Sequence, residues 1–237
     1  MGFTRFVNDV ILCCENDYQK GRILTTRFIY HDIINCLVGA LDAKDVYTAG
    51  HSERVGDMAH DLAEIYGLEE REMDSVHIAG HLHDIGKIGI SDKILLKESA
   101  LTDEEFEEIK KHPEIGSKIL LNSTLLNEVS SIVLHHHERY DGRGYPNGLA
   151  GEDIPLGSRI IAICDSIDAM MSNRIYRPAF SWDYCKKEIL SNAGKMYDPV
   201  LVAAINEELW FKWANYYIKL NKKIDNTSFI LKDDQII

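Results

Sequence analysis

The sequence predicts an all-α fold, because apolar residues recur at helical spacing, helix-capping signals recur along the chain, and no alternating runs are joined by a hairpin signal. The clearest amphipathic segment follows His51, and Gly67 stands where a C-terminal cap is expected. The apolar positions of this segment are Val55, Met58, Ala59, Leu62, Ala63 and Tyr66. We therefore expect a helix from about His51 to Gly67.

Two further helices are indicated by the residues at their starts. Thr102 with Glu105 forms a capping-box pattern, which predicts a helix that runs to about Lys111. Pro113 then suits the first turn of the next helix, where its missing N–H costs no hydrogen bond.

The C-terminal half of the chain carries another helix and a long loop. Ser181 is a good N-cap residue, and Gly194 is expected to end the helix that begins there. Residues 140–156 are rich in Gly, Asp, Asn and Pro, and so long a loop inside a compact domain is usually functional or disordered. Tyr145 and Pro146 within this loop argue against simple disorder.

Three segments are expected along the chain: a short helical lead-in (1–27), a main domain (28–205) and a C-terminal helical extension with a polar tail (206–237). The extension is aromatic, and its aromatic residues are Trp210, Phe211, Trp213, Tyr216 and Tyr217. Such spacing is more typical of a packing helix or an oligomer contact than of a cofactor site.

The overall composition is that of an ordinary globular protein, with 45% hydrophobic and 27% charged residues. A net charge of -12 disfavours long nucleic acids, whose binding depends on Lys and Arg. No secretory signal and no apolar run of about 18 residues is evident, so we expect a cytoplasmic protein without a membrane span. The five cysteines show no metal-type spacing, and we expect reduced thiols.

Histidine and aspartate are concentrated in one segment. The cluster comprises His51, His81, His83, His112, His135, His136 and His137, with Asp84 and Asp165. Imidazole and carboxylate together suit Fe, Mn, Zn or Ni better than Ca or Mg. His31, His60 and His77 have no assigned partner in this pattern.

The adjacent pair His83-Asp84 is the centre of the prediction. Both side chains can reach a metal cluster at a helix end, and the two oxygens of Asp84 can bridge two ions. Lys87 follows three residues later on the same helix face, where its ammonium can meet a phosphate oxygen.

Five sequence motifs together resemble the HD-GYP family within the HD phosphohydrolase superfamily. They are His51-Ser52-Glu53-Arg54-Val55, His81-Leu82-His83-Asp84-Ile85-Gly86-Lys87, Lys111-His112-Pro113-Glu114-Ile115-Gly116, His136-His137-Glu138-Arg139-Tyr140-Asp141-Gly142-Arg143-Gly144-Tyr145-Pro146 and Asp165-Ser166-Ile167-Asp168-Ala169-Met170, the last continuing to Arg174-Ile175-Tyr176-Arg177. The resemblance covers roughly residues 30–205 and implies an HD-type helical bundle with a Gly-Tyr-Pro loop.

The resemblance also implies a metal site. The positions that match ligands shared by the superfamily are His51, His83, Asp84 and Asp165, and those that match the additional HD-GYP ligands are His112, His136 and His137. His135 is a neighbour that the family pattern does not require. Some members bind three metals through a Glu four residues before the first ligand, where this chain has Tyr47, so we expect two divalent transition metals, Fe or Mn, with Zn or Ni as alternatives.

Substrate contacts are implied for a second set of residues. The resemblance implies contacts with substrate phosphates for Arg174 and Arg177, whose guanidinium groups suit phosphate oxygens. Tyr145 is expected to touch the substrate, with Gly144 allowing close backbone approach. Asp45 matches a position near the catalytic centre, Lys87 and Asp84 are the expected catalytic residues, and Asp168 could orient a ligand from behind.

The function implied by the resemblance is hydrolysis of cyclic di-GMP to linear pGpG, or on to GMP, by a hydroxide held between two metals. Cyclic GMP-AMP remains an alternative substrate. An HD-type nucleotidase is a second alternative, although a one-metal enzyme would not need His112, His136 and His137. A third is a non-catalytic domain that binds the messenger or a protein. A homodimer or a diguanylate cyclase contact is the protein partnership that we expect.

Overall fold

The computed structural model describes residues 32–45, 50–173 and 178–218, and within these ranges the regular structure is helical apart from one isolated bridge between Ala193 and Tyr197. The all-α prediction is confirmed. Helices without labels span residues 32–44 and 207–218. The labelled α-helices are α3 (His51–Tyr66), α4 (Glu70–Leu82), α5 (Asp92–Leu95), α6 (Asp103–Ile109), α7 (His112–Leu120), α8 (Asn127–Leu134), α9 (Leu156–Met171), α10 (Trp182–Ser191) and α11 (Pro199–Ala204), and the 3-10 helices are η2 (Ile85–Gly89), η3 (Thr124–Leu126) and η4 (Gly151–Asp153).

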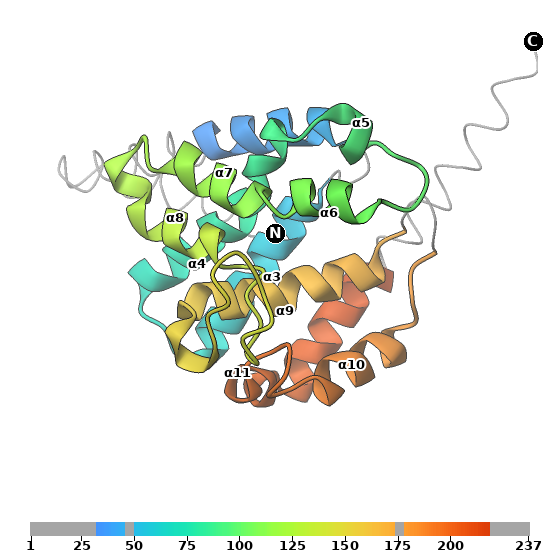
Figure 1. The fold of residues 1–237 in the computed structure, drawn as a ribbon. Coiled ribbons are helices and arrows are strands. Elements are labelled where there is room, and N and C mark those ends of the chain that lie inside the picture. The colour runs from blue at the N-terminus through green and yellow to red at the C-terminus, as the bar shows by residue number, and fades with distance from the viewer. Residues whose placement is uncertain (1–31, 46–49, 174–177, 219–237) are drawn as a thin grey trace, which may run out of the picture.

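The helices form two halves around a central pair (Figure 1). Helix 32–44 and α5 to α8 make the upper half in this view, and α9 to α11 make the lower half with helix 207–218. Helix α3 packs on both α4 and α9, and α4 packs on α8 and α9, so the central pair joins the halves. One core of buried apolar residues extends through both halves. Among the described residues, no helix combines the length and the apolar character needed to cross a membrane.

The helix boundaries follow the capping signals in most places. Gly67 ends α3 with a left-handed φ of 92°, as expected for a residue without a Cβ. Thr102 accepts a hydrogen bond from the Glu105 amide, and the reciprocal bond of the capping box is present. The next helix, α7, has its proline in the first turn.

The predicted end of the helix that starts at Ser181 was wrong. Ser181 caps α10 as expected, but the helix ends at Ser191, three residues before Gly194. The side-chain amide of Asn192 donates to the Glu188 carbonyl over 3.0 Å and so competes with the next helical hydrogen bond. Gly194 adopts a positive φ of 78° in the following turn, where its amide bonds to the Tyr197 carbonyl.

Helix 207–218 packs into the main core. Trp210, Trp213 and Tyr217 are 3%, 2% and 1% exposed, whereas Phe211 and Tyr216 lie at the surface. The buried three lie in the same apolar cluster as residues of α3 and α9. This segment therefore stabilises the helical bundle rather than extending from it.

Candidate metal centre

The His83-Asp84 pair lies at the junction between α4 and η2. His83 is the C-terminal cap of α4, and Asp84 is the N-terminal cap of η2. A Cβ at Gly86 would lie 1.9 Å from the His112 carbonyl oxygen, so η2 presses directly on the start of α7. The absence of a side chain at Gly86 thus brings Asp84 close to the first histidine of the next motif.

One group of predicted ligands gathers around the end of α4. The Nε2 atom of His51 lies 3.2 Å from Nε2 of His83, 3.7 Å from Oδ2 of Asp84 and 3.4 Å from Oδ1 of Asp165. His51 comes from the start of α3 and Asp165 from α9, so three helices converge here. His51, His83 and Asp84 are buried and each offers a ligand atom within 4.8 Å of the others.

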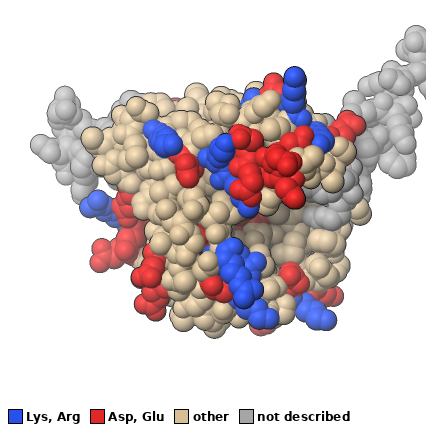
Figure 2. Space-filling model, in the orientation of Figure 1, with Lys and Arg blue, Asp and Glu red and all other residues tan. Residues whose placement is uncertain are grey.

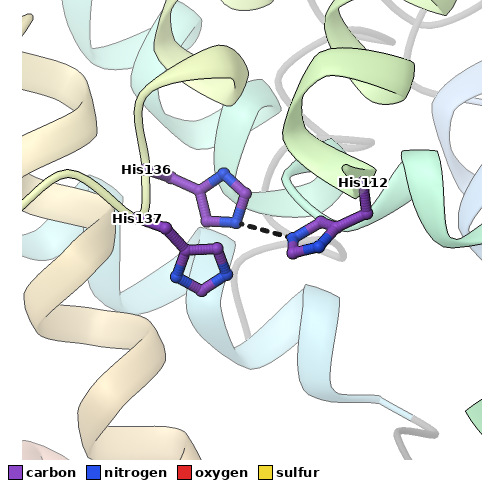
Figure 3. Close-up of side chains that lie close together, drawn as sticks. All are labelled: His112, His136 and His137. Atoms are coloured by element: carbon purple, nitrogen blue, oxygen red, sulfur yellow. Dashed lines mark hydrogen bonds between the residues drawn. The ribbon is translucent and has the colours of Figure 1, made fainter. Parts of the chain in front are cut away.

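A second group consists of His112, His136 and His137 (Figure 3). His112 opens α7, and the other two follow the end of α8, with all three rings turned toward one another. The Nε2 atoms of His112 and His136 are 3.3 Å apart, and the rings of His136 and His137 have centroids 4.1 Å apart. The structure thus brings together every predicted metal ligand.

Asp84 lies between the two groups, with one oxygen toward each. Its Oδ2 atom is 3.4 Å from Nε2 of His83, and its Oδ1 atom is 3.3 Å from Nε2 of His112. A carboxylate that offers separate oxygens to two sets of imidazoles has the donor arrangement for a ligand shared by two cations.

The imidazoles are oriented by hydrogen bonds at their far nitrogens. The Nδ1 atoms of His83, His112 and His136 lie 2.7, 2.7 and 2.6 Å from backbone carbonyls. A carbonyl only accepts, so Nδ1 carries the proton and the Nε2 lone pair faces the centre of the site. This pattern is typical of metal-ligating histidines.

The two groups differ in their affinity for protons. Burial disfavours charge on His51, but hydrogen bonds to Asp165 and Asp168 outweigh it and raise its pKa to about 9. Burial instead lowers the pKa of His136, and it lowers the pKa of His137 to about 3. Without a metal, the first group therefore holds a proton and the second group stays neutral.

Lys87 lies beside Asp84, as the three-residue spacing predicts. Its Nζ atom is 2.7 Å from Oδ2 of Asp84 and 3.5 Å from Oδ2 of Asp45. Burial opposes its charge, yet the two carboxylates, with Asp84 first, raise its pKa above the usual range. Asp45 is 5% exposed and faces Lys87, so its predicted contact with substrate stays a prediction.

The Gly-Tyr-Pro loop closes over the second group. The ring of Tyr145 lies 4.9 Å from that of His137, between centroids. A Cβ at Gly144 would lie 2.3 Å from the Arg139 amide nitrogen, so the loop backbone folds tightly on itself at this position. The buried carboxylate of Glu138 accepts a 2.7 Å hydrogen bond from the backbone amide of Asn147 and so fixes the far side of the loop.

Asp168 lies behind His51, where its Oδ2 atom is 2.7 Å from Nδ1 of that ring. Arg54 donates to both Asp168 oxygens, and the hydroxyl of Tyr217 donates to Oδ1. The sequence motifs do not assign this role to Arg54 or Tyr217. Arg54 lies three residues after His51, which could have suggested a shared face, but no local signal links Tyr217 to Asp168 across 49 positions.

Some predicted residues are not placed by the structure or lie outside the cluster. Tyr47, Arg174 and Arg177 fall outside the described residues, as does His31. His135 places its Nδ1 atom 2.9 Å from the Ser131 carbonyl and takes no part in either group. Figure 2 shows acidic side chains gathered over α6.

Comparison with known proteins identifies the family. A family model for the HD domain matches residues 35–201. The chain belongs to the HD domain family. The site described above lies in this HD domain, since its residues run from Asp45 to Asp168.

Curated relatives of this HD domain are named as phosphodiesterases. A cyclic di-GMP phosphodiesterase of Thermotoga maritima is 41% identical over 205 residues, covering 86% of this chain and 52% of the relative. The cyclic di-GMP phosphodiesterase response regulator RpfG of Xanthomonas campestris is 40% identical over 176 residues, covering 73% of this chain and 47% of the relative. The 3'3'-cGAMP-specific phosphodiesterase 2 of Vibrio cholerae is 37% identical over 178 residues, covering 74% of this chain and 34% of the relative. The chain thus spans about half the length of the first two relatives.

Solved structures share the helical fold of this HD domain. A cyclic GMP-AMP-specific phosphodiesterase of Vibrio cholerae (V-cGAP3) aligns with a TM-score of 0.60 at 17% identity, over 79% of this chain and 52% of that one. Bd1817, an HDGYP protein from Bdellovibrio bacteriovorus, aligns with a TM-score of 0.55 at 17% identity, over 81% and 63%. These two likenesses show a shared fold, whereas the family model and the curated relatives confirm the resemblance stated from the sequence motifs.

Proposed function

We propose that this HD domain hydrolyses cyclic di-GMP, or a related cyclic dinucleotide such as cyclic GMP-AMP, to a linear dinucleotide and on to the mononucleotide. The observation that carries the proposal is the position of Asp84 between two histidine groups. A one-metal phosphohydrolase would use the first group alone, whereas the second has no use without a second ion. The names of the relatives support cyclic dinucleotides as the substrate class.

The donors fit two divalent transition metals, for which Fe or Mn is our first expectation and Zn or Ni the alternative. His51, His83 and Asp165 would hold one ion, His112, His136 and His137 the other, and Asp84 both. Such ions would supply an activated water nucleophile and Lewis-acid stabilisation of phosphoryl oxygens.

The side chains around this centre would orient the substrate. The ammonium of Lys87, held protonated by two carboxylates, can attract a phosphate oxygen and stabilise its negative charge in the transition state. Tyr145 forms a wall beside His137 that can contact a nucleotide. Arg174 and Arg177 are proposed to bind substrate phosphates. Asp168 keeps the proton of His51 on Nδ1, which leaves Nε2 free as a ligand.

The remaining parts of the proposal concern the whole chain. Residues 28–205 would form the catalytic unit, and residues 1–27 and 206–237 would flank it. The expected location is the cytoplasm. A homodimer or a diguanylate cyclase is the proposed protein partner, which size-exclusion chromatography with light scattering, alone and with a cyclase, would test.

The decisive experiment compares metal loading with product formation. The full chain is loaded anaerobically with Fe or Mn, its metal content is measured, and the products of cyclic di-GMP and cyclic GMP-AMP are separated by ion-exchange chromatography. We expect a linear dinucleotide from at least one substrate. The Asp84→Asn variant should lose metal and activity, whereas Asp153→Asn, an equal charge change at the exposed end of η4, should retain both.

Other outcomes would favour the alternatives. Full metal loading with release of phosphate from mononucleotides, and no cleavage of cyclic dinucleotides, would indicate a nucleotidase. Tight binding of the cyclic dinucleotide without any cleavage by the metal-loaded protein would indicate a non-catalytic receptor.

A further inference from the structure

A second cluster of potential ligands lies on another face of the α3–α4 pair. Asp57, His77 and His81 each offer one ligand atom, and these atoms all lie within 4.8 Å of one another. None of the three belongs to the histidine groups around Asp84. His77 and His81 are four residues apart on α4 and so share one face, with their Nε2 atoms 2.8 Å apart.

Close packing of the two helices builds this cluster. A Cβ at Gly80 would lie 2.6 Å from the Cα atom of Gly56, so the backbones of α3 and α4 approach each other at these glycines. A Cβ at Gly56 would lie 2.9 Å from the ring of His81. The contact places the carboxylate of Asp57, one residue further along α3, against the imidazoles of α4.

The charges around the cluster favour a cation. Burial, with the nearby charges of Glu53 and Asp61, raises the pKa of Asp57 to about 6. A carboxylate in such surroundings is stabilised by any positive charge that it can bind. Lys212 is paired with Asp61 over 2.6 Å and, like Arg54, lines the same cavity, so its charge offsets the raised pKa of Asp57 only in part.

A cavity gives the cluster access from solvent. It has a volume of about 420 Å³, and its walls include Asp57, His60, His77, Trp213 and Tyr216. A water or a small anion in this cavity could complete the coordination of an ion held by three protein ligands, as in open zinc sites.

We propose that Asp57, His77 and His81 bind a divalent transition metal of the zinc class, separate from the centre around Asp84. Two imidazoles and one carboxylate are a common donor set for such ions, and the i, i+4 histidines present both rings to one point. The ion joins α3 to α4, the helices that carry His51 and His83. Its binding therefore stabilises the fold, independently of the proposed phosphodiesterase activity.

The test measures bound ions and thermal stability in the full chain. Wild type, His77→Gln and His60→Gln are dialysed against Zn²⁺, and the ions per chain are counted by elemental analysis. His60 is the matched control, because its ring lies 5.5 Å from that of His77 while its own potential ligand partners are Asp61 and Glu64 rather than the three residues of this cluster. We expect His77→Gln to bind one ion fewer than wild type and His60→Gln to bind the same number.

Thermal unfolding separates loss of the ion from loss of the fold. Without metal, His77→Gln should unfold near the wild-type temperature, and Zn²⁺ should raise that temperature less than it does in wild type. The proposal is overturned if His77→Gln binds as many Zn²⁺ ions as wild type and Zn²⁺ raises its unfolding temperature by the same amount. It is also overturned if His60→Gln loses as much bound Zn²⁺ as His77→Gln does. If His77→Gln is unstable without metal, Asp57→Asn, which keeps the size of the side chain, replaces it in the same comparison. Hydrolysis of cyclic di-GMP with Mn²⁺ by His77→Gln tests the proposed function separately.

Discussion

The hydroxyl of Tyr217 donates a hydrogen bond to Asp168, so helix 207–218 reaches the residue that orients His51. Tyr217 lies beyond the region that matches the HD domain model, which ends at residue 201. Asp168 is almost fully buried and accepts hydrogen bonds from Arg54 as well. The C-terminal helix is therefore coupled to the candidate metal centre through a single buried carboxylate.

Replacing Tyr217 by Phe tests this coupling. The change removes one hydrogen bond to a buried carboxylate, and we expect the free energy of unfolding to fall by roughly 1–3 kcal/mol. Weaker support of His51 should also lower metal affinity by about 10–100-fold, as for other partners behind a ligand. Urea unfolding and metal titration measure the two effects.

The neighbouring Tyr216 provides the control for this variant. It is 48% exposed, so Tyr216→Phe should leave both stability and metal affinity near wild type. If Tyr217→Phe lowers stability without changing metal affinity, the tyrosine supports the fold but not the site.

The metal-free protein should be most stable near pH 6.5. The pKa of His51 in the folded protein is about 9, above its ordinary 6.5. Its contribution to the free energy of unfolding, on the order of 3 kcal/mol, is therefore full below pH 6.5 and is lost as the pH rises toward 9. The folded pKa of His137 is about 3, so unfolding takes up protons below pH 6.5 and stability also falls as the pH decreases. Urea unfolding from pH 4 to 10 with a chelator measures the profile.

The His51→Gln variant assigns the alkaline limb of this profile. It should lose the decline between pH 6.5 and 9 while keeping the acid limb. A wild-type profile that is flat above pH 6.5 would contradict the raised pKa of His51.

Most of the candidate site could be predicted from the sequence because its predicted ligands lie in contiguous motifs. His83-Asp84 and His136-His137 are adjacent in the chain, and the spacing of Lys87 from Asp84 fixes their contact. Periodicity and caps likewise predict α3, α6 and α10. Contacts between distant segments carry no such local signal. The hydrogen bond from Tyr217 to Asp168 and the approach of Gly80 to Gly56 both depend on how helices pack, which one sequence alone does not specify.

The Gly86→Ala variant tests the contact between η2 and α7. The added methyl group would lie 1.9 Å from the His112 carbonyl oxygen and 2.5 Å from the Gly116 amide nitrogen. Both are backbone atoms that cannot rotate away, so η2 must shift, and we expect a loss of roughly 1–3 kcal/mol or more of stability. Thermal and urea unfolding measure the loss.

Gly39 offers a matched control in helix 32–44. A Cβ there meets no atom within 4 Å, so Gly39→Ala should leave stability unchanged or raise it by about 1 kcal/mol through helix propensity. Equal unfolding temperatures for Gly86→Ala and wild type would mean that η2 and α7 are not in close contact.

Removing ligands from one histidine group should release one metal and leave the other. His136→Gln removes a predicted ligand of the second group, while His51 and His83 still lie 3.7 and 3.4 Å from Oδ2 of Asp84, and Asp165 lies 3.4 Å from His51. We expect the ions bound per chain at this centre to fall from two to one, measured by elemental analysis after Mn²⁺ loading. His135→Gln is the adjacent control and should keep both, because that ring faces the Ser131 carbonyl. Loss of both ions in His136→Gln would show that the two groups bind metal only together. Retention of both would exclude His136 as a ligand and remove the main support for a shared role of Asp84.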